Sequence, residues 1–338
     1  MVWACMDPCA TAAPVTDALQ RPALQVRAPH QAVLLSAAQA GERIVAVGER
    51  GIIVRSDDRG ASWRQVPCPV SVTLTTVRFA DARHGVAVGH GGSVLTSSDG
   101  GQTWVLKLDG RRAAQLARQA ATTPAAQQEA ERLLADGPDK PFLDVLLWDA
   151  RRMLAVGAYG LAFHSADGGQ TWTPWMDRLP NPKALHWHVA RAAGDTVLLA
   201  GEQGLLARSD DGGQRFQALA SPYKGSWFAG HLAADGQAVL GGLRGQVWRS
   251  ADAGSSWSPL PVAAPATITA LAPAADGSLL LANQAGQLLR LQGDVLQPLP
   301  QPPLPMPAAL LPLRQGGLLA LGMAGVVAVA PAAAGAKP

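Results

Sequence analysis

The stretch VAVGHGGSVLTSSDGGQTW, residues 86–104, decides the fold of this 338-residue chain. An apolar run is followed by Gly-x-x-Gly, a second apolar run, and then Ser-x-Asp-x-Gly-x-Thr-Trp. The glycine pair is typical of a tight turn between two antiparallel strands, because glycine adopts positive φ readily. The aspartate can accept hydrogen bonds from turn N–H groups, while the Ser and Thr hydroxyls can form hydrogen bonds with adjacent segments of the same chain. We expect the tryptophan to pack between adjacent sheets.

The motif recurs along the chain. Full copies also occupy residues 45–63, 154–172 and 239–257, and the copy at 198–216 ends in Arg215-Phe216 instead of Ser/Thr-Trp. Two further copies, at residues 279–291 and 318–330, keep the strand–turn–strand pattern without the aspartate box. We assign a structural role to the five box aspartates, which are Asp58, Asp99, Asp167, Asp211 and Asp252.

The spacing of the copies predicts the number of repeats. The first turn positions fall at residues 48, 89, 157, 201, 242, 283 and 322, so that all steps but one lie near 40 residues. A period near 40 with several short apolar strands per unit is typical of propeller blades. We predict an all-β, seven-bladed β-propeller of four-stranded blades. It would form a single domain over residues 19–330, between disordered segments at 1–18 and 331–338.

The seventh unit offers only three strands, at residues 309–312, 318–321 and 326–329, and the sequence PAAAGAKP that follows cannot supply a fourth. Residues 23–27 precede the first inner strand and have no other place in the repeat. We predict that they complete the last blade, which would close the ring and remove an open sheet edge.

The one long step, from 89 to 157, contains an insertion at about residues 109–140 that is rich in Ala, Gln, Arg and Glu. Thr123 followed by Pro124 is typical of a helix N-cap and first helical position, which predicts two short helices that break there. The insertion joins the outer strand of one blade to the inner strand of the next. It should therefore lie on the face that carries the Gly-x-x-Gly turns, here called the turn face, with the aspartate boxes on the opposite face. A docking flap and a solvated decoration are both open interpretations.

We expect a partner to bind on the turn face. In ALHWHVAR, residues 184–191, strand alternation places His186 and His188 on one side and Trp187 on the other. A His-x-His pair can bind a metal, but no third ligand is evident, so we interpret the pair as hydrogen-bonded channel lining. Trp227 and Phe228 could anchor a partner, although strand packing is favoured. The candidate partner-binding residues are Arg50, His90, Tyr159, His186, Trp187, His188, Trp227 and Arg244.

Composition excludes several classes of function. The net charge is only +3 and the basic residues are scattered, which gives no case for nucleic acid. The apolar stretch 318–330 is short for a membrane span, and the N-terminus is not a complete signal peptide. Cys5, Cys9 and Cys68 are too few for a disulfide framework; Cys5 and Cys9 could pair or bind a metal weakly, but free terminal thiols are favoured.

Catalytic signals are weak. No P-loop, dinucleotide fingerprint or Ser/His/Asp order is present, so we predict no cofactor, no metal and no catalytic residue. Glycoside hydrolysis needs two converging carboxylates. The acids that we nominate for it are Asp144 and Asp177, for which ordinary strand-end and turn roles are favoured.

The repeats resemble the Asp-box, or bacterial neuraminidase, repeat superfamily. Within it, GERGIIVRSDDRGASW at residues 48–63 is similar to the motif of the photosystem II assembly and stability factor family and its bacterial relatives. The likeness extends over about residues 23–330. It implies a non-enzymatic, chaperone-like platform for the assembly of a membrane complex, usually outside the cytoplasm.

Our leading hypothesis is thus a monomeric propeller that binds a protein partner from a membrane or envelope complex. The compartment would be the periplasm or another extracytoplasmic space, with the cytoplasm left open. The alternative is a sialidase-like glycoside hydrolase or a carbohydrate-binding propeller.

Overall fold

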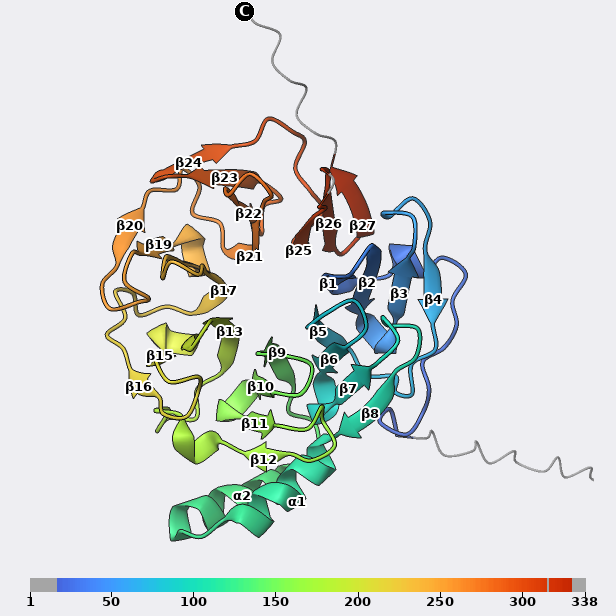
Figure 1. The fold of residues 1–338 in the computed structure, drawn as a ribbon, viewed down its shortest axis with the longest axis vertical. Helices are drawn as coiled ribbons and strands as arrows, with labels where there is room; N and C mark the ends of the chain where they lie inside the picture. The colour runs from blue at the N-terminus through green and yellow to red at the C-terminus, as the bar shows by residue number, and fades with distance from the viewer. Residues whose placement is uncertain (1–16, 315, 330–338) are drawn as a thin grey trace, which may run out of the picture.

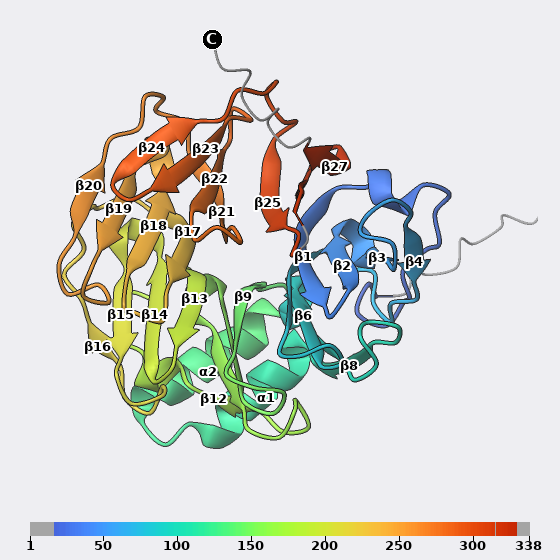
Figure 2. The ribbon, with the colours of Figure 1, turned by 45° about the horizontal axis from the view of Figure 1, so that its top comes forward.

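Seven antiparallel sheets stand around a central channel in a computed structural model that describes residues 17–314 and 316–329 (Figure 1). Six of the sheets have four strands and the last has three. Along the chain, each sheet follows the previous one around the ring, with its first strand innermost (Figure 2). The predicted seven-bladed propeller is confirmed.

The strands divide among the blades as follows. Blade 1 has β1 Leu34–Ala40, β2 Arg43–Gly48, β3 Ile53–Ser56 and β4 Arg64–Val66; blade 2 has β5 Leu74–Phe79, β6 Gly85–Gly89, β7 Val94–Ser97 and β8 Val105–Leu108. Blade 3 has β9 Phe142–Leu147, β10 Met153–Gly157, β11 Ala162–Ser165 and β12 Thr173–Pro174; blade 4 has β13 Trp187–Ala193, β14 Thr196–Gly201, β15 Leu206–Ser209 and β16 Gln217–Ala218. Blade 5 has β17 Trp227–Leu232, β18 Ala238–Gly242, β19 Val247–Ser250 and β20 Ser258–Leu260; blade 6 has β21 Ile268–Pro273, β22 Leu279–Asn283, β23 Leu288–Gln292 and β24 Val295–Pro298; blade 7 has β25 Pro307–Pro312, β26 Leu318–Gly322 and β27 Gly325–Val329.

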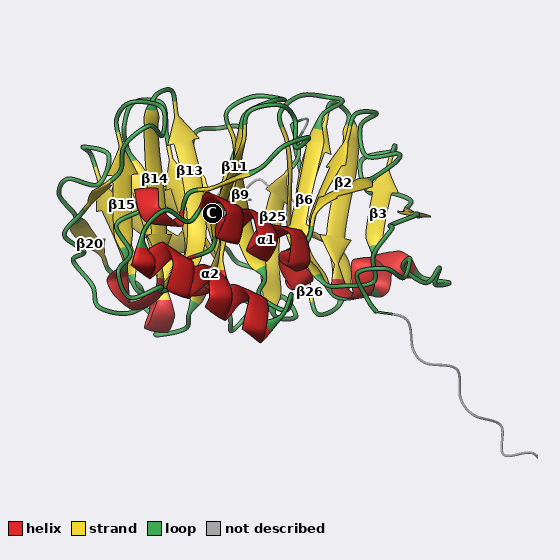
Figure 3. Ribbon diagram, turned by 90° about the horizontal axis from the view of Figure 1, so that it is seen from below, coloured by secondary structure: helices red, strands yellow, loops and turns green. Residues whose placement is uncertain are grey.

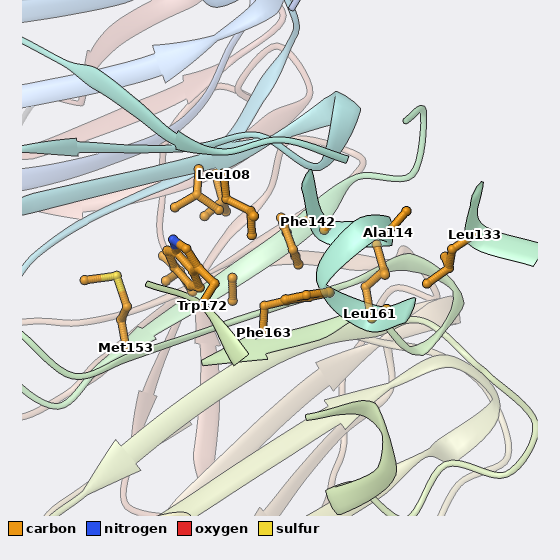
Figure 4. Close-up of a cluster of buried hydrophobic side chains, with 14 of the residues drawn as sticks. Leu108, Ala114, Leu133, Phe142, Met153, Leu161, Phe163 and Trp172 are labelled. Atoms are coloured by element: carbon orange, nitrogen blue, oxygen red, sulfur yellow. The ribbon is translucent and has the colours of Figure 1, made fainter. Parts of the chain in front are cut away.

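The hydrophobic core lies between neighbouring blades rather than at the centre of the ring. Figure 4 shows the cluster between blades 2 and 3, where Leu108 and Phe142 pack with Phe163 and Trp172. Each such side chain is less than a tenth exposed, and full burial of a large apolar side chain stabilises the fold by roughly 1.5–3 kcal/mol. The second strand of each blade is apolar and has a neighbouring blade on both sides.

The aspartate boxes brace the turns between the third and fourth strands. In blade 2, Asp99 Oδ1 accepts hydrogen bonds from Ser97 Oγ at 2.8 Å and from the backbone N of Thr103 at 3.0 Å, and Oδ2 accepts one from Thr103 Oγ1 at 2.6 Å. Trp104 is buried and donates from Nε1 to the carbonyl of Gly101. Asp58, Asp167, Asp211 and Asp252 have equivalent bonds.

The fourth box shows how the motif tolerates a changed ending. Arg215 stands where the other boxes have Ser or Thr. Its Nε donates to Asp211 Oδ2 at 3.0 Å, so the guanidinium replaces the missing hydroxyl as the carboxylate's partner.

The insertion forms two helices, α1 Gly110–Ala120 and α2 Pro124–Asp136, which lie along the outer side of blade 3, where α1 contacts both β12 and the turn η3 His90–Gly92 (Figure 3). Asp109 caps α1, and Thr123 Oγ1 caps α2 by accepting a hydrogen bond from the backbone N of Ala126. On α1, Ala113, Ala114 and Ala117 are buried in the same cluster as Leu161 and Phe163 of blade 3. The insertion is therefore packed into the core and is not a solvated decoration.

The predicted closure of blade 7 by residues 23–27 is wrong, because these residues form no strand. They lie beside the outer strand of blade 1, where the backbone N of Ala23 donates to the carbonyl of Cys68 and the backbone N of Val26 donates to Gln65 Oε1. The short 3₁₀ helix η1, Pro29–Gln31, which follows them in the chain, contacts β27.

The segments predicted to be disordered, residues 1–18 and 331–338, lie outside the described residues except for Asp17 and Ala18. Cys5 and Cys9 also lie outside the described residues. Asp17 and Ala18 are ordered: Asp17 pairs with Arg111 of α1, and Ala18 accepts a hydrogen bond from the backbone N of Ser71. In the part of the chain that the structure describes, no helix is long and apolar enough to cross a membrane.

Candidate functional site

Five short 3₁₀ turns shape the turn face: η2 Glu49–Gly51, η3 His90–Gly92, η4 Ala158–Gly160, η6 Glu202–Gly204 and η7 Leu243–Gly245. Their middle residues have positive φ, including Arg50 at 52°, Tyr159 at 54° and Arg244 at 57°. Left-handed backbone costs a non-glycine residue roughly 1–2 kcal/mol. Arg50, Tyr159 and Arg244 are exposed there, as is His90 at the first position of its turn.

Two of the turns hold the neighbouring inner strand through a glutamate. Glu49 Oε1 accepts a hydrogen bond from the backbone N of Val33, and Glu202 Oε2 accepts one from the backbone N of His186. Burial raises the pKa of Glu202, but its hydrogen bonds with His186 outweigh burial and leave the pKa below its usual value. These carboxylates position the strands that lead into the channel.

Four ring side chains from blades 3, 4 and 5 form a continuous row, here called the aromatic strip: Tyr159, His186, His188 and Phe228. The Tyr159 and His186 ring centroids are 4.8 Å apart, those of the two histidines 6.2 Å, and those of His188 and Phe228 5.0 Å. Lys140 Nζ lies 5.5 Å from the Tyr159 ring centroid. The two ends of the strip are its most accessible parts, with Tyr159 48% and Phe228 37% exposed.

Hydrogen bonds orient both histidines. His186 Nδ1 lies 2.8 Å from Glu202 Oε2, and His188 Nδ1 lies 2.8 Å from the carbonyl oxygen of Trp227. A carbonyl can only accept, so His188 carries a proton on Nδ1. Burial lowers the pKa of His188, which keeps the ring neutral at pH 7 and leaves Nε2 as an acceptor. No group of three His, Cys, Asp or Glu side chains within the described residues could hold a metal ion.

The structure corrects the assignment of Trp187 and Trp227 to partner binding. Both indoles are completely buried between blades, so neither can contact a partner. Their neighbours in sequence, His186, His188 and Phe228, are at least partly exposed instead, as strand alternation requires, and His188 and Phe228 line the cavity inside the ring.

A charged cluster crosses the wall of the central channel. Asp144 of β9 accepts from Arg78 Nη2 of β5 at 2.8 Å and from Arg191 Nη1 of β13 at 2.5 Å. Its two oxygens also accept from the backbone N of Val145 and of Ala190. Arg191 Nε in turn donates to the carbonyl of Gly230 on β17, so the cluster links blades 2, 3, 4 and 5.

Asp144 is fixed as a carboxylate. Burial raises its pKa, but the positive charges of Arg78 and Arg191, with the hydrogen bonds, outweigh burial and hold the pKa below its usual value. Asp177 lies in the short helix η5, Met176–Arg178, and lines a different cavity. The two acids nominated for glycoside hydrolysis therefore do not converge on one cleft.

Reasoning from the sequence missed Arg78 and Arg191 as the partners of Asp144. One signal was available. Asp144 is a charged residue among the apolar residues of an inner strand, and a buried charge of this kind needs a partner of opposite charge. The separation in sequence hides these pairs, since Asp144 lies 66 residues from Arg78 and 47 residues from Arg191.

A groove of about 360 Å³ adjoins the aromatic strip at Tyr159. It lies between the two insertion helices and the connection from blade 3 to blade 4. Small and apolar side chains line most of it, including Ala117, Ala121, Ala126, Ala130, Met176 and Pro182. We call it the alanine groove.

Comparisons with known proteins find similarity to the same family that the sequence motifs resemble, the photosystem II assembly factors. Residues 55–120 match the family described as photosynthesis system II assembly factor YCF48. A 48-residue stretch is 48% identical to the chloroplastic photosystem II stability/assembly factor HCF136 of Cyanidioschyzon merolae (strain NIES-3377 / 10D). That stretch is 14% of this chain and 11% of the relative.

Solved propellers resemble the whole fold. A structure of YCF48 bound to a D1 peptide is similar with a TM-score of 0.65 and 17% identity over 90% of this chain and 97% of that chain. YCF48 from Cyanidioschyzon merolae has a TM-score of 0.64 at 14% identity, covering 88% and 94% of the two chains. The WD40 propeller domain of Doa1 has a TM-score of 0.63 at 9% identity, covering 92% and 95%. At these identities the likeness is one of fold, and this chain is a β-propeller that resembles the photosystem II assembly factors.

Proposed function

We propose that this protein is a non-enzymatic binding platform that holds a segment of a protein partner on its turn face during assembly of a membrane or envelope complex. The observation that carries the proposal is the aromatic strip beside the alanine groove. Exposed aromatic residues next to an apolar groove are typical of the centre of a protein interface.

The strip is suited to binding because it is rigid before a partner arrives. Tyr159 is held by its turn and by contact with His186, which Glu202 fixes. Side chains that are already ordered lose little conformational entropy on association, so more of the contact energy remains as affinity.

The groove and strip also suggest the chemistry of the segment. The walls are alanines, which leave room for larger apolar side chains, and Lys140 stands beside Tyr159 at the junction. An extended or helical segment with two or three apolar residues would fill the groove and cover Tyr159 and Phe228.

The compartment and stoichiometry belong to the same proposal. The relative described as a photosystem II stability/assembly factor and the structure of YCF48 bound to a D1 peptide support a protein partner from a membrane complex. By the same analogy we place this chain outside the cytoplasm and expect it to act as a monomer, with no nucleic-acid partner.

The structural role of Asp144 supports binding over hydrolysis. Its oxygens accept five hydrogen bonds, three to Oδ1 and two to Oδ2. A carboxylate so engaged is a poor general acid, because its proton would have to displace two arginines.

Affinity capture from membranes of the native host tests the proposal. The bait is the wild-type chain or the variant Tyr159→Ser/Phe228→Ser, with bound proteins quantified by mass spectrometry. We expect the variant to lose, by about tenfold or more, a defined set of membrane-complex subunits, as for truncation of interface hot spots.

Val105→Ser/Val295→Ser is the matched control, since both valines are exposed apolar residues on outer strands, away from the strip. It should retain the same subunits as wild type. Equal capture by all three baits would contradict a binding role for the strip.

A further inference from the structure

The central channel contains a cavity of about 240 Å³ that plays no part in the function proposed above. Residues from the innermost strand of every blade line it. Among the described residues that line it, the charged ones are Arg78, Asp144 and Arg191. His188 and Phe228 also line it, so the cavity adjoins the inner end of the aromatic strip. A small cavity with charged walls is a candidate site for a small charged ligand.

Two guanidinium groups share a single carboxylate in this cavity. Arg78 and Arg191 both bind Asp144, and no second acid is found among the described residues that line the cavity. Burial lowers the pKa of Arg191 and the positive charge of Arg78 lowers it further, and together they outweigh the opposing effect of Asp144. One positive charge is therefore left without a counter-charge. An excess charge in a partly buried cavity favours an ion of opposite sign.

Both arginines also have N–H groups that the protein does not use. Arg78 donates from Nε and Nη2 to Asp144, and Arg191 donates from Nε to the carbonyl of Gly230 and from Nη1 to Asp144. In the described part of the chain, neither Arg78 Nη1 nor Arg191 Nη2 has a hydrogen-bond partner. The two side chains are 34% and 23% exposed and line the cavity, so these groups are available to a ligand there. Because both guanidinium groups contact the same carboxylate, one small ligand can reach both.

We infer that this cavity binds one small tetrahedral oxyanion of the phosphate class, held by Arg78 and Arg191. Guanidinium groups form strong, charge-assisted hydrogen bonds with phosphate oxygens. The two arginines belong to β5 and β13, which contact β9 from opposite sides, so they approach a ligand from different directions. A tetrahedral ion presents oxygens to both, whereas a flat carboxylate matches the edge of one guanidinium. The site requires neither the aromatic strip nor a protein partner, and it does not depend on the proposed function.

Calorimetric titration of the wild-type protein with sodium phosphate at pH 7 tests the inference, with sodium chloride holding the ionic strength constant. We expect saturable binding of one phosphate per chain. Sodium acetate at the same ionic strength should bind about tenfold more weakly, because it loses at least one hydrogen bond to a charged donor. Absence of saturable phosphate binding, or equally tight binding of acetate, would overturn the inference.

A matched pair of variants at Ser36 locates the ion. Ser36 lines the cavity from β1, and its Oγ accepts a hydrogen bond from the backbone N of Val77, the residue before Arg78. Ser36→Asp keeps an acceptor for Val77 and adds a negative charge to the cavity, so it should weaken phosphate binding by about a hundredfold. Ser36→Asn has nearly the same shape without the charge and should bind phosphate as the wild type does. Equal affinities of the two variants would mean that phosphate binds elsewhere, as an adventitious ion only, and the inference would be wrong.

Arg78→Lys tests the donor itself. Lysine keeps the positive charge beside Asp144 but lacks the second arm of the guanidinium, so we expect phosphate to bind about tenfold more weakly. Thermal unfolding without phosphate establishes that the variant is folded, and the Ser36 pair decides the inference if it is not. Unchanged affinity in the folded variant would contradict contact between Arg78 and the ion.

Discussion

Asp144 illustrates how a single residue is committed to structure. It is 2% exposed and joins two arginines from different blades. Asp144→Asn keeps the shape but leaves both arginines without their counter-charge, and breaking a buried ion pair costs about 3–5 kcal/mol. We expect a loss of this size in the free energy of unfolding, measured with denaturant at pH 7.

Asp294→Asn provides the control for that prediction. Asp294 pairs with Arg249 but is 78% exposed, and exposed pairs contribute about 0–1 kcal/mol. Similar losses for the two variants would mean that the channel cluster does not stabilise the ring.

The box aspartates predict an acid-sensitive fold. Burial raises the pKa of Asp99, but hydrogen bonds from Thr103 and Ser97 outweigh it and bring the pKa to about 2. A carboxyl group with a depressed folded-state pKa stabilises the fold above its unfolded value of about 3.9, and that contribution is lost as the pH falls towards 2.

Denaturant unfolding of the wild type at pH 6, 4 and 2.5 should therefore show stability falling most steeply below pH 4. Asp99→Asn should be less stable at pH 6 but lose less on acidification. A variant with the same pH dependence as wild type would rule out this carboxylate as a source of acid sensitivity.

Residue-level prediction from sequence succeeded where strand alternation decides the outcome. ALHWHVAR correctly separated His186 and His188 from Trp187. It could not reveal that Trp187 and Trp227 are both completely buried, or that Tyr159 completes a row with the histidines. Those facts depend on which blade faces which.

At the level of elements, glycine is required in the turns for two separate reasons, a positive φ and the lack of space for a Cβ atom. Gly204 has φ of 78°, and a Cβ atom there would lie 2.3 Å from the carbonyl oxygen of Tyr223. Gly277 has nearly the same φ, 80°, but no atom within 4 Å of such a Cβ. The pair isolates steric crowding from backbone strain.

Gly277→Ala should lower the free energy of unfolding by about 1–2 kcal/mol, the cost of left-handed backbone. Gly204→Ala should add about 1–3 kcal/mol for the clash with the connector into blade 5. Thermal and denaturant unfolding of the two variants checks the order, and equal losses would contradict the close approach.

The one element that was mispredicted has a physical explanation. Residues 23–27 precede the first inner strand, β1, and have no other place in the repeat. The repeat pattern alone therefore led to the prediction that they close blade 7. The backbone bonds of Ala23 to Cys68 and of Val26 to Gln65 are contacts with blade 1 that no repeat pattern encodes. By contrast, Thr123-Pro124 marked the break between the insertion helices because capping is local.

For the whole molecule, the period of the first turn position, which is Asn283 in the sixth copy and glycine in the others, was enough to predict seven blades, because each turn must recur once per blade to keep the sheets in register. Unequal stability around the ring was not predictable in the same way. Among residues 17–314 and 316–329, blade 7 has three strands where every other blade has four, and local opening is easiest where few hydrogen bonds hold the backbone.

Hydrogen exchange should therefore be faster in blade 7 than elsewhere in the ring. Blade 6 is the internal control, since it also lacks an aspartate box but has four strands. We expect amides of residues 318–329 to exchange well before those of 279–298 in mass-spectrometric measurements. Equal protection in the two blades would show that the outer strand does not matter for local stability.

Because each described blade is built from strands that are consecutive in the chain, the architecture has a consequence for how such a ring changes over evolutionary time. Each described sheet is made from one uninterrupted stretch of chain, and none borrows a strand from the opposite end of the protein. Duplicating or deleting one such stretch adds or removes a complete sheet and leaves no half-built sheet behind. The junction between blades 7 and 1 is thus the natural point at which this gene could grow or shrink by one repeat.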